Sequence, residues 1–166
     1  MREANPGIGD IVRQGDVFLL KIGDADQPVP QDAEILEDGI LARGEATGHT
    51  HSVAVLESML TEEDLLFLEE VQKKICAPIV FKDKTTGIAR RSNGGGVPLE
   101  QHQIAKIHAP TPFIFSHMEA GVGIVPTEKE AQVRDLHSAF LMPAGRYLVI
   151  RQVEHDEAEQ MRRVVD

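Results

Sequence analysis

The chain has 166 residues and a mass of 18.3 kDa, which is enough for one ordinary domain with a sizeable core and too little for two large ones. Acidic side chains outnumber basic ones by 27 to 17, and the resulting net charge of −10 disfavours binding to a nucleic-acid backbone. A lone cysteine forms no internal disulfide, and no apolar run is long enough for a membrane-spanning helix. We therefore expect a cytoplasmic protein that binds neither nucleic acid nor membrane.

Strand-like segments occupy the first third of the chain. Residues 15–22 begin with a Gly-Asp turn and continue as an apolar run that is typical of a buried strand. After a loop that contains Pro28 and Pro30, residues 40–44 and 49–56 are again rich in β-branched side chains. We predict a strand in each of these three segments.

A helix is predicted to begin at Thr61, because this hydroxyl residue precedes three acidic residues that suit the first helical turn. Apolar side chains then recur at three- and four-residue steps over residues 65–75, which predicts one apolar face. The helix is expected to end near residues 76–78, where a proline follows Cys76 and Ala77.

The pattern between this helix and residue 110 is less regular. It predicts a short strand over residues 79–81, a glycine-rich connection over 93–96 and a short second helix over 98–106. We interpret residues 57–110 as a helical or loop insertion in a single β-rich domain that spans residues 1–166.

The last third returns to strand-like text. Strands are predicted over residues 112–117, 122–125, 139–142 and 145–153, and the turn Pro143-Ala144-Gly145 leads into the last of them. Short strands separated by Gly, Pro and Asp turns are typical of a small barrel or a sandwich. The predicted fold class is therefore mainly β, with a helix-containing insertion.

Histidines at two-residue spacing are the strongest chemical signal. His49 and His51 are two residues apart, so an extended backbone places both rings on one face of a strand. His117 and Glu119 repeat this step with a carboxylate as the second member, and His137 precedes a later strand. We predict that these five residues are candidate ligands for one divalent metal ion.

Neutral imidazoles and carboxylates together form catalytic sites for zinc, iron, manganese or nickel, in which one coordination position stays open. Two further carboxylates, Glu45 and Asp135, lie close in sequence to the histidines. Either is a candidate for an acceptor that fixes an imidazole tautomer or for a general base. The competing interpretation is that the histidines are structural and bond to backbone carbonyl groups.

Four short motifs also resemble those of small uncharacterised bacterial and phage proteins. In order, they are Arg-Gln-Gly-Asp-Val at residues 13–17, Thr-Gly-His-x-His at 47–51, a histidine approach to Pro-x-Gly at 137–145, and Arg-Gln-x-Glu at 151–154. The resemblance covers the two ends of the chain and leaves residues 57 to about 120 unmatched. It supports the choice of residues and implies no particular reaction.

This chain departs from those proteins in one motif. They often have His-x-x-His before the Pro-x-Gly turn, whereas here Arg134 stands in the first place and only His137 remains. A four-histidine site would therefore need a substitute ligand. The His-x-His and Pro-x-Gly elements are also similar to those of cupins, although the spacing of the second cupin motif is not matched.

Two functions follow from these patterns. The first is a small metal-binding β-barrel protein in which His49, His51 and His137 hold the ion, with hydrolase or lyase chemistry through metal-activated water as its enzymatic extension. The second is a non-enzymatic interaction or assembly module with structural histidines, as in a bacterial or phage accessory protein. The expected partners are a small-molecule ligand or another protein chain, including a second copy in a homo-oligomer.

Overall fold

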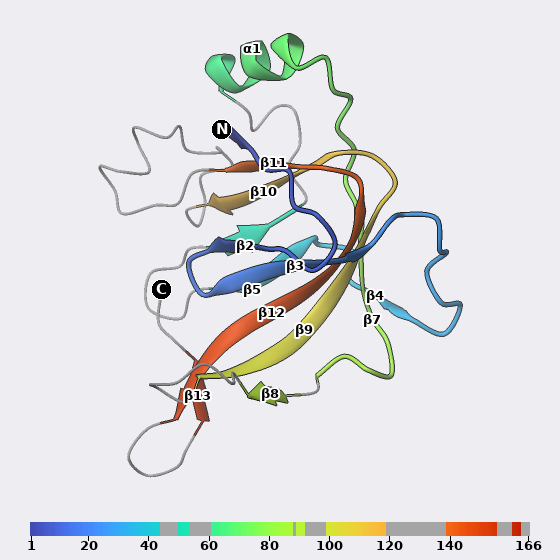
Figure 1. Ribbon diagram of the computed structural model, residues 1–166, viewed down its shortest axis with the longest axis vertical. Helices are drawn as coiled ribbons and strands as arrows, with labels where there is room; N and C mark the ends of the chain where they lie inside the picture. The colour runs from blue at the N-terminus through green and yellow to red at the C-terminus, as the bar shows by residue number, and fades with distance from the viewer. Residues whose placement is uncertain are drawn as a thin grey trace.

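The described part of the chain forms two β-sheets that enclose a common core, with one helix at one end (Figure 1). This computed structural model describes residues 1–43, 50–53, 61–87, 89–91, 99–118, 139–155 and 161–163. The prediction of a mainly β fold is confirmed, and the described strands form a sandwich-like pair of sheets rather than a closed barrel.

The smaller sheet contains five strands. Their spatial order is β1 (Arg2–Glu3), β11 (Phe140–Met142), β10 (Phe113–Met118), β6 (Thr50–Ser52) and β5 (Ile40–Arg43). The first pair, β1 with β11, is parallel, and the other neighbours are antiparallel. The middle of this sheet thus places β10 and β6, each carrying one histidine of the predicted site, side by side.

The larger sheet contains eight strands. Six of them follow the order β2 (Ile11–Gln14), β3 (Val17–Gly23), β12 (Gly145–His155), β9 (Leu99–Ala109), β7 (Ile79–Lys82) and β4 (Glu34–Ile35). The remaining two pair at its margin, β13 (Met161–Arg163) with β12 and β8 (Ala89–Arg91) with β9. All of these pairings are antiparallel.

The core forms because side chains alternate between the two faces of each strand. From the larger sheet, Val17, Leu19, Tyr147 and Val149 point inward and are fully buried. From the smaller sheet, Phe113 packs against Tyr147. The two rings lie edge to face with a centroid distance of 5.4 Å. The Tyr147 hydroxyl donates a 2.7 Å hydrogen bond to the carbonyl of Pro143, so its polar end is also satisfied.

The single described helix, α1 (Glu62–Glu70), begins where the sequence predicts. The Thr61 hydroxyl accepts a hydrogen bond from the backbone N–H of Asp64, and the Asp64 carboxylate accepts one from the N–H of Thr61. The helix ends at Glu70, earlier than predicted, with Val71 as its C-cap, and Gln72 follows with a φ of 50°. No helix among the described residues is long and apolar enough to cross a membrane.

The prediction of a second helix over residues 98–106 is wrong, because residues 99–106 belong to β9. Gln103, Ala105, Ile107 and Ala109 are buried, while the residues between them are only partly covered. That two-residue alternation matches a strand that is packed on one face. With β7 and β8 in the same sheet, the interval 57–110 supplies three strands besides α1.

The turn into β12 requires glycine. Gly145 has a φ of 154°, and a Cβ atom there would lie 3.0 Å from the carbonyl oxygen of Gly23 and from Cε of Lys21. Because Gly145 has no side chain, the first residue of β12 can pack closely against the end of β3. From this point β12 runs across the centre of the larger sheet and carries Arg151 to the site described next.

Candidate functional site

A cluster of polar side chains is buried between the two sheets. It contains Gln14, Asp16, His51, His117 and Arg151, and none of these residues is more than 4 % exposed. Charged side chains are rarely buried to this extent unless they are paired. We refer to these five residues as the inter-sheet cluster.

Two histidines of the predicted site meet in this cluster. His51 on β6 and His117 on β10 are direct partners in the antiparallel register. Their rings stack with a centroid distance of 4.5 Å and an angle of only 3° between the ring planes. Residues that lie 66 positions apart in sequence thus form one imidazole pair, since β10 returns beside β6.

The larger sheet contributes an ion pair. Arg151 donates a hydrogen bond from Nε to Oδ2 of Asp16 at 2.5 Å, and its Nη2 reaches the carbonyl of Arg43 at 3.5 Å. The backbone N–H of Gln152 donates to the carbonyl of Asp16 at 2.8 Å. Both the side chain and the backbone of Asp16 are therefore anchored to β12.

Local geometry explains why Asp16 points into this space. Gly15 and Asp16 form the two-residue connection between β2 and β3, where Gln14 pairs with Val17. Gly15 has a φ of 58°, in the left-handed region that glycine adopts most readily, and its carbonyl accepts a 2.8 Å hydrogen bond from Nε of Arg13.

His51 links the histidine pair to the ion pair. Its Nε2 lies 3.5 Å from Oδ1 of Asp16, and its Nδ1 lies 3.3 Å from Oε1 of Gln14. Oδ1 of Asp16 is buried and accepts no hydrogen bond within the described part of the chain. One carboxylate oxygen is thus held by Arg151, whereas the other faces an imidazole nitrogen.

The sequence did not single out Asp16, Arg151 or Gln14 as site residues. A signal was present, since all three lie within the Arg-Gln-Gly-Asp-Val and Arg-Gln-x-Glu motifs at residues 13–17 and 151–154. What the motifs alone do not reveal is the pairing of the β2–β3 turn with β12.

The other predicted site residues lie outside the described part of the chain: Glu45, His49, Glu119, Asp135 and His137. Their assignments as metal ligands or as bases stay predictions. Among the residues that the structure does describe, no group of three or more His, Cys, Asp or Glu side chains is arranged to hold a metal ion.

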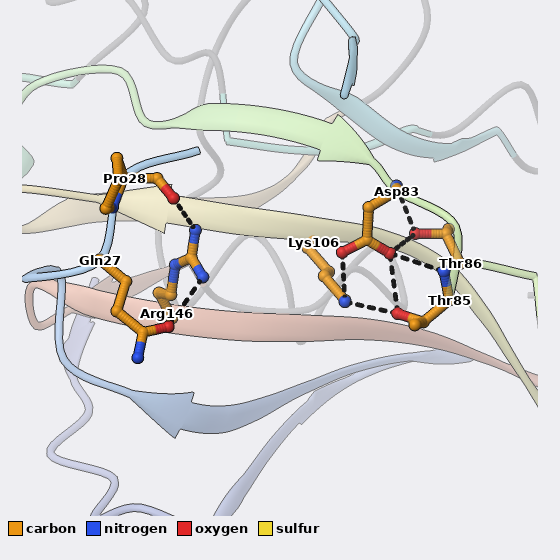
Figure 2. Close-up of polar contacts among 7 residues, drawn as sticks. All are labelled: Gln27, Pro28, Asp83, Thr85, Thr86, Lys106 and Arg146. Carbon is orange, nitrogen blue, oxygen red and sulfur yellow. Dashed lines mark hydrogen bonds and ion pairs between the residues drawn. The ribbon is translucent and has the colours of Figure 1, made fainter. Parts of the chain in front are cut away.

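A second polar cluster, drawn in Figure 2, includes Lys106 of β9. Lys106 points away from the core, because its neighbours Ala105 and Ile107 are buried in it. Oδ2 of Asp83 accepts a 2.5 Å hydrogen bond from Nζ of Lys106, and Oδ1 accepts bonds from the backbone N–H and the hydroxyl of Thr85 and from the hydroxyl of Thr86. Burial alone would raise the pKa of Asp83, but these hydrogen bonds and the charge of Lys106 outweigh it and hold the pKa far below its usual value.

Further along this face, Arg146 fastens the loop before β4 to the sheet. Its Nη2 donates to the carbonyl of Pro28 at 2.8 Å, and Nη1 donates to the side chain of Gln27 at 3.4 Å (Figure 2). The guanidinium also lies over the Phe81 ring, 5.6 Å from its centroid. On the neighbouring strand, burial lowers the pKa of His108, and the charge of Arg146 lowers it further.

Comparison with known proteins shows that part of this chain is similar to an uncharacterised domain. Residues 13–90, slightly less than half of the chain, match a domain of unknown function, DUF8820. The matched part includes Asp16 and His51 but neither His117 nor Arg151. No curated protein and no solved structure matches the chain.

Proposed function

We propose that this protein binds a divalent metal ion at its buried histidines, with His51 as the first ligand. His49 and His137 are the proposed further imidazole ligands, and His117 or Glu119 is an additional candidate. The observation that carries the proposal is the inter-sheet cluster itself, where stacked imidazoles lie beside a buried carboxylate that is only half satisfied.

The energetics of burial favour a functional role for this cluster. Burying an ion pair such as Asp16 and Arg151 costs solvation free energy that their attraction does not reliably offset, and apolar residues of similar volume often stabilise as well or better. Strongly buried polar groups at the meeting point of several strands are therefore candidates for a site. Imidazole nitrogen and carboxylate oxygen suit zinc or iron, and they also accept manganese or nickel.

Elemental analysis tests the proposal. The protein is purified without an affinity tag, and its metal content is measured for the natural sequence and for a His49→Ala, His51→Ala double variant. His108→Ala is the matched control, because His108 lies on β9 opposite Arg146 and Ile79, away from the inter-sheet cluster. The expected result is stoichiometric metal in the natural protein and in the control, and its loss in the double variant. A natural protein that takes up no metal contradicts the proposal.

Hydrolase or lyase chemistry is the enzymatic extension of this proposal. Glu45 and Asp135 are the proposed general bases, since a base beside a metal site can take a proton from water or substrate. Glu45→Gln and Asp135→Asn variants would then lose turnover of a cleavable ester or phosphoester while they keep their metal. Equal turnover in both variants and in the natural protein would count against these roles.

A second candidate function is protein interaction through α1. This helix exposes Leu66 at 62 % and Leu65 at 41 %, whereas Leu68 packs against Ile114 and Leu141. Exposed leucines on one helix are consistent with an interaction module or a homo-oligomer. Light scattering after size exclusion tests self-association: a Leu65→Glu, Leu66→Glu variant should be smaller than the natural protein if α1 forms the contact, and a natural protein that is already monomeric argues against it.

A further inference from the structure

We infer that the exposed face of α1 binds a basic amphipathic helix of another protein. The inference rests on the second proposed function, protein interaction through α1, and it names the chemistry of the partner. That partner presents lysine or arginine side chains around an apolar one, and its charge is therefore opposite to that of α1.

The apolar part of this face is formed by two leucines. Leu65 and Leu66 are exposed, whereas Leu68 on the other side of the helix packs against Ile114 and Leu141 of the smaller sheet. Figure 1 shows α1 at one end of the molecule, beyond β10 and β11, with no other described element over its outer side. Packing thus fixes one side of α1 and leaves an apolar pair on the other, as in a contact surface.

Glutamates surround Leu66 on the helix surface. They occupy all four positions that lie three or four residues from it along the chain, namely Glu62, Glu63, Glu69 and Glu70, and all four are exposed. Residues at these spacings are neighbours on a helix, so Leu66 lies at the centre of four carboxylates. None of the four forms an ion pair with a described residue.

The charge at the carboxyl end of α1 opposes the helix dipole. Glu69 and Glu70 lie in the last turn, which contains no basic residue, although negative side chains are unfavourable beside the partly negative carbonyl groups of this end. The chain then turns at Gln72, which has a φ of 50°, and Lys73 beyond it pairs with Glu3 of β1. The described part of the chain therefore leaves this repulsion uncompensated, and cations from a partner would relieve it.

The spacing of the carboxylates suits a partner that is itself a helix. The glutamates form two pairs seven residues apart, Glu62 with Glu69 and Glu63 with Glu70. Seven residues is the repeat at which charged side chains flank the apolar contact of paired helices and select the partner. A second copy of α1 does not fit, because it would bring four more carboxylates against the first four.

A synthetic peptide tests the inference on the full chain. The probe is a fluorescently labelled helix of about 14 residues, or four turns, with leucines on one face and lysines on the other. One reference peptide has glutamate in place of lysine, and another has serine in place of leucine. Fluorescence anisotropy at low salt gives the dissociation constant of each peptide.

Three variants locate the binding surface. Glu69→Gln, Glu70→Gln removes two charges from α1, and Leu66→Ser removes its apolar centre. Glu34→Gln, Glu37→Gln is the matched control, because it removes two exposed carboxylates at and beside β4, which belongs to the larger sheet and lies away from α1 (Figure 1).

We expect the leucine–lysine peptide to bind the natural protein and both reference peptides to bind more weakly. Its dissociation constant should rise about 3- to 10-fold in Glu69→Gln, Glu70→Gln and in Leu66→Ser, and stay unchanged in the control. The variant Glu69→Gln, Glu70→Gln should also unfold at a higher temperature than the natural protein, since an unfavourable interaction with the helix dipole is removed. A damaged fold would then not explain its weaker binding.

Other outcomes overturn the inference. Equal weakening in Glu34→Gln, Glu37→Gln would show that the peptide follows the net charge of the chain and not α1. If Leu66→Ser weakens binding but Glu69→Gln, Glu70→Gln does not, and the leucine–glutamate peptide binds equally well, α1 has no preference for a basic partner. The inference then fails while interaction through α1 stands. If no peptide binds and light scattering shows a monomer, interaction through α1 fails as well.

Discussion

Asp16 and Asp83 form the same kind of ion pair in very different surroundings. Each carboxylate meets a basic side chain from a neighbouring strand at 2.5 Å, Arg151 in one case and Lys106 in the other. Asp83 is 19 % exposed and both of its oxygens accept hydrogen bonds, whereas Asp16 is nearly inaccessible and only one of its oxygens does. The satisfied pair fixes a turn, and the incompletely satisfied pair marks the candidate site.

The largest difference between the two pairs should appear when each is broken. Replacing Asp16 with alanine leaves the Arg151 charge buried without a counterion, which should cost about 3–5 kcal/mol of unfolding free energy. Urea unfolding of the metal-free protein, followed by circular dichroism, measures this cost. A loss below about 1 kcal/mol, the range of an exposed ion pair, would show that Arg151 finds a new partner or water.

A change at Gly145 disturbs the strand on which Arg151 is carried. An alanine side chain there meets the Gly23 carbonyl at 3.0 Å and forces an unfavourable φ, so we expect a loss of about 1–3 kcal/mol. Thermal unfolding measures it, with Ala144→Ser as a control in the same turn. If the two variants unfold alike, the close approach of β12 to β3 is not a constraint on stability.

Breaking the outer pair should have a smaller effect, together with a distinct pH dependence. Asp83→Ala is expected to cost about 1–2 kcal/mol, because charge-assisted hydrogen bonds are lost from a partly exposed side chain. Since the pKa of Asp83 is lowered on folding, its contribution is complete above the unfolded-state pKa, begins to decrease below about pH 4 and is lost only as the pH approaches the much lower folded-state pKa. Unfolding experiments between pH 7 and 3 should therefore show a constant difference between the natural protein and the variant down to about pH 4, and a difference that starts to narrow below it.

His108 gives the smallest expected effect. Burial, aided by the charge of Arg146, lowers its pKa in the folded protein, so the unfolded chain binds more protons just below pH 6.5. This residue therefore contributes to a fall in stability as the pH decreases from about 6.5, and His108→Gln should reduce that fall. The comparison requires unfolding free energies of both proteins at pH 7.5 and 5.5. An identical pH dependence in the two proteins would contradict the assignment.

The sequence predicts local elements well where one strong signal decides them. The capping box at Thr61 and the apolar run that became β3 are both found at the expected places. The sequence-based prediction of a helix over residues 98–106 is wrong. The alternation of buried Ala105, Ile107 and Ala109 is hard to recognise in the sequence, because histidines, glutamines and a lysine make up much of β9. Propensity is a weak guide to a central strand that is specified by its neighbours.

The candidate site was predictable only in part. Spacing identified His51 and His117 as possible ligands, and the structure brings these two together. Their exact pairing and the approach of Asp16 and Arg151 depend on which strands become neighbours, and no local pattern contains that information. A turn and a late strand meet here across 135 residues.

Because His51 and His117 are direct partners in the register of β6 and β10, the stacking of their rings also reports when these two strands pair correctly during folding. Because neighbouring side chains of a strand point to opposite faces, sliding β6 by a single residue along β10 would turn Thr50 or Ser52 inward in place of the imidazole. Only one alignment of these two strands stacks the rings. A spectroscopic signal from the stacked rings would therefore appear at the moment in folding when the smaller sheet acquires its native alignment.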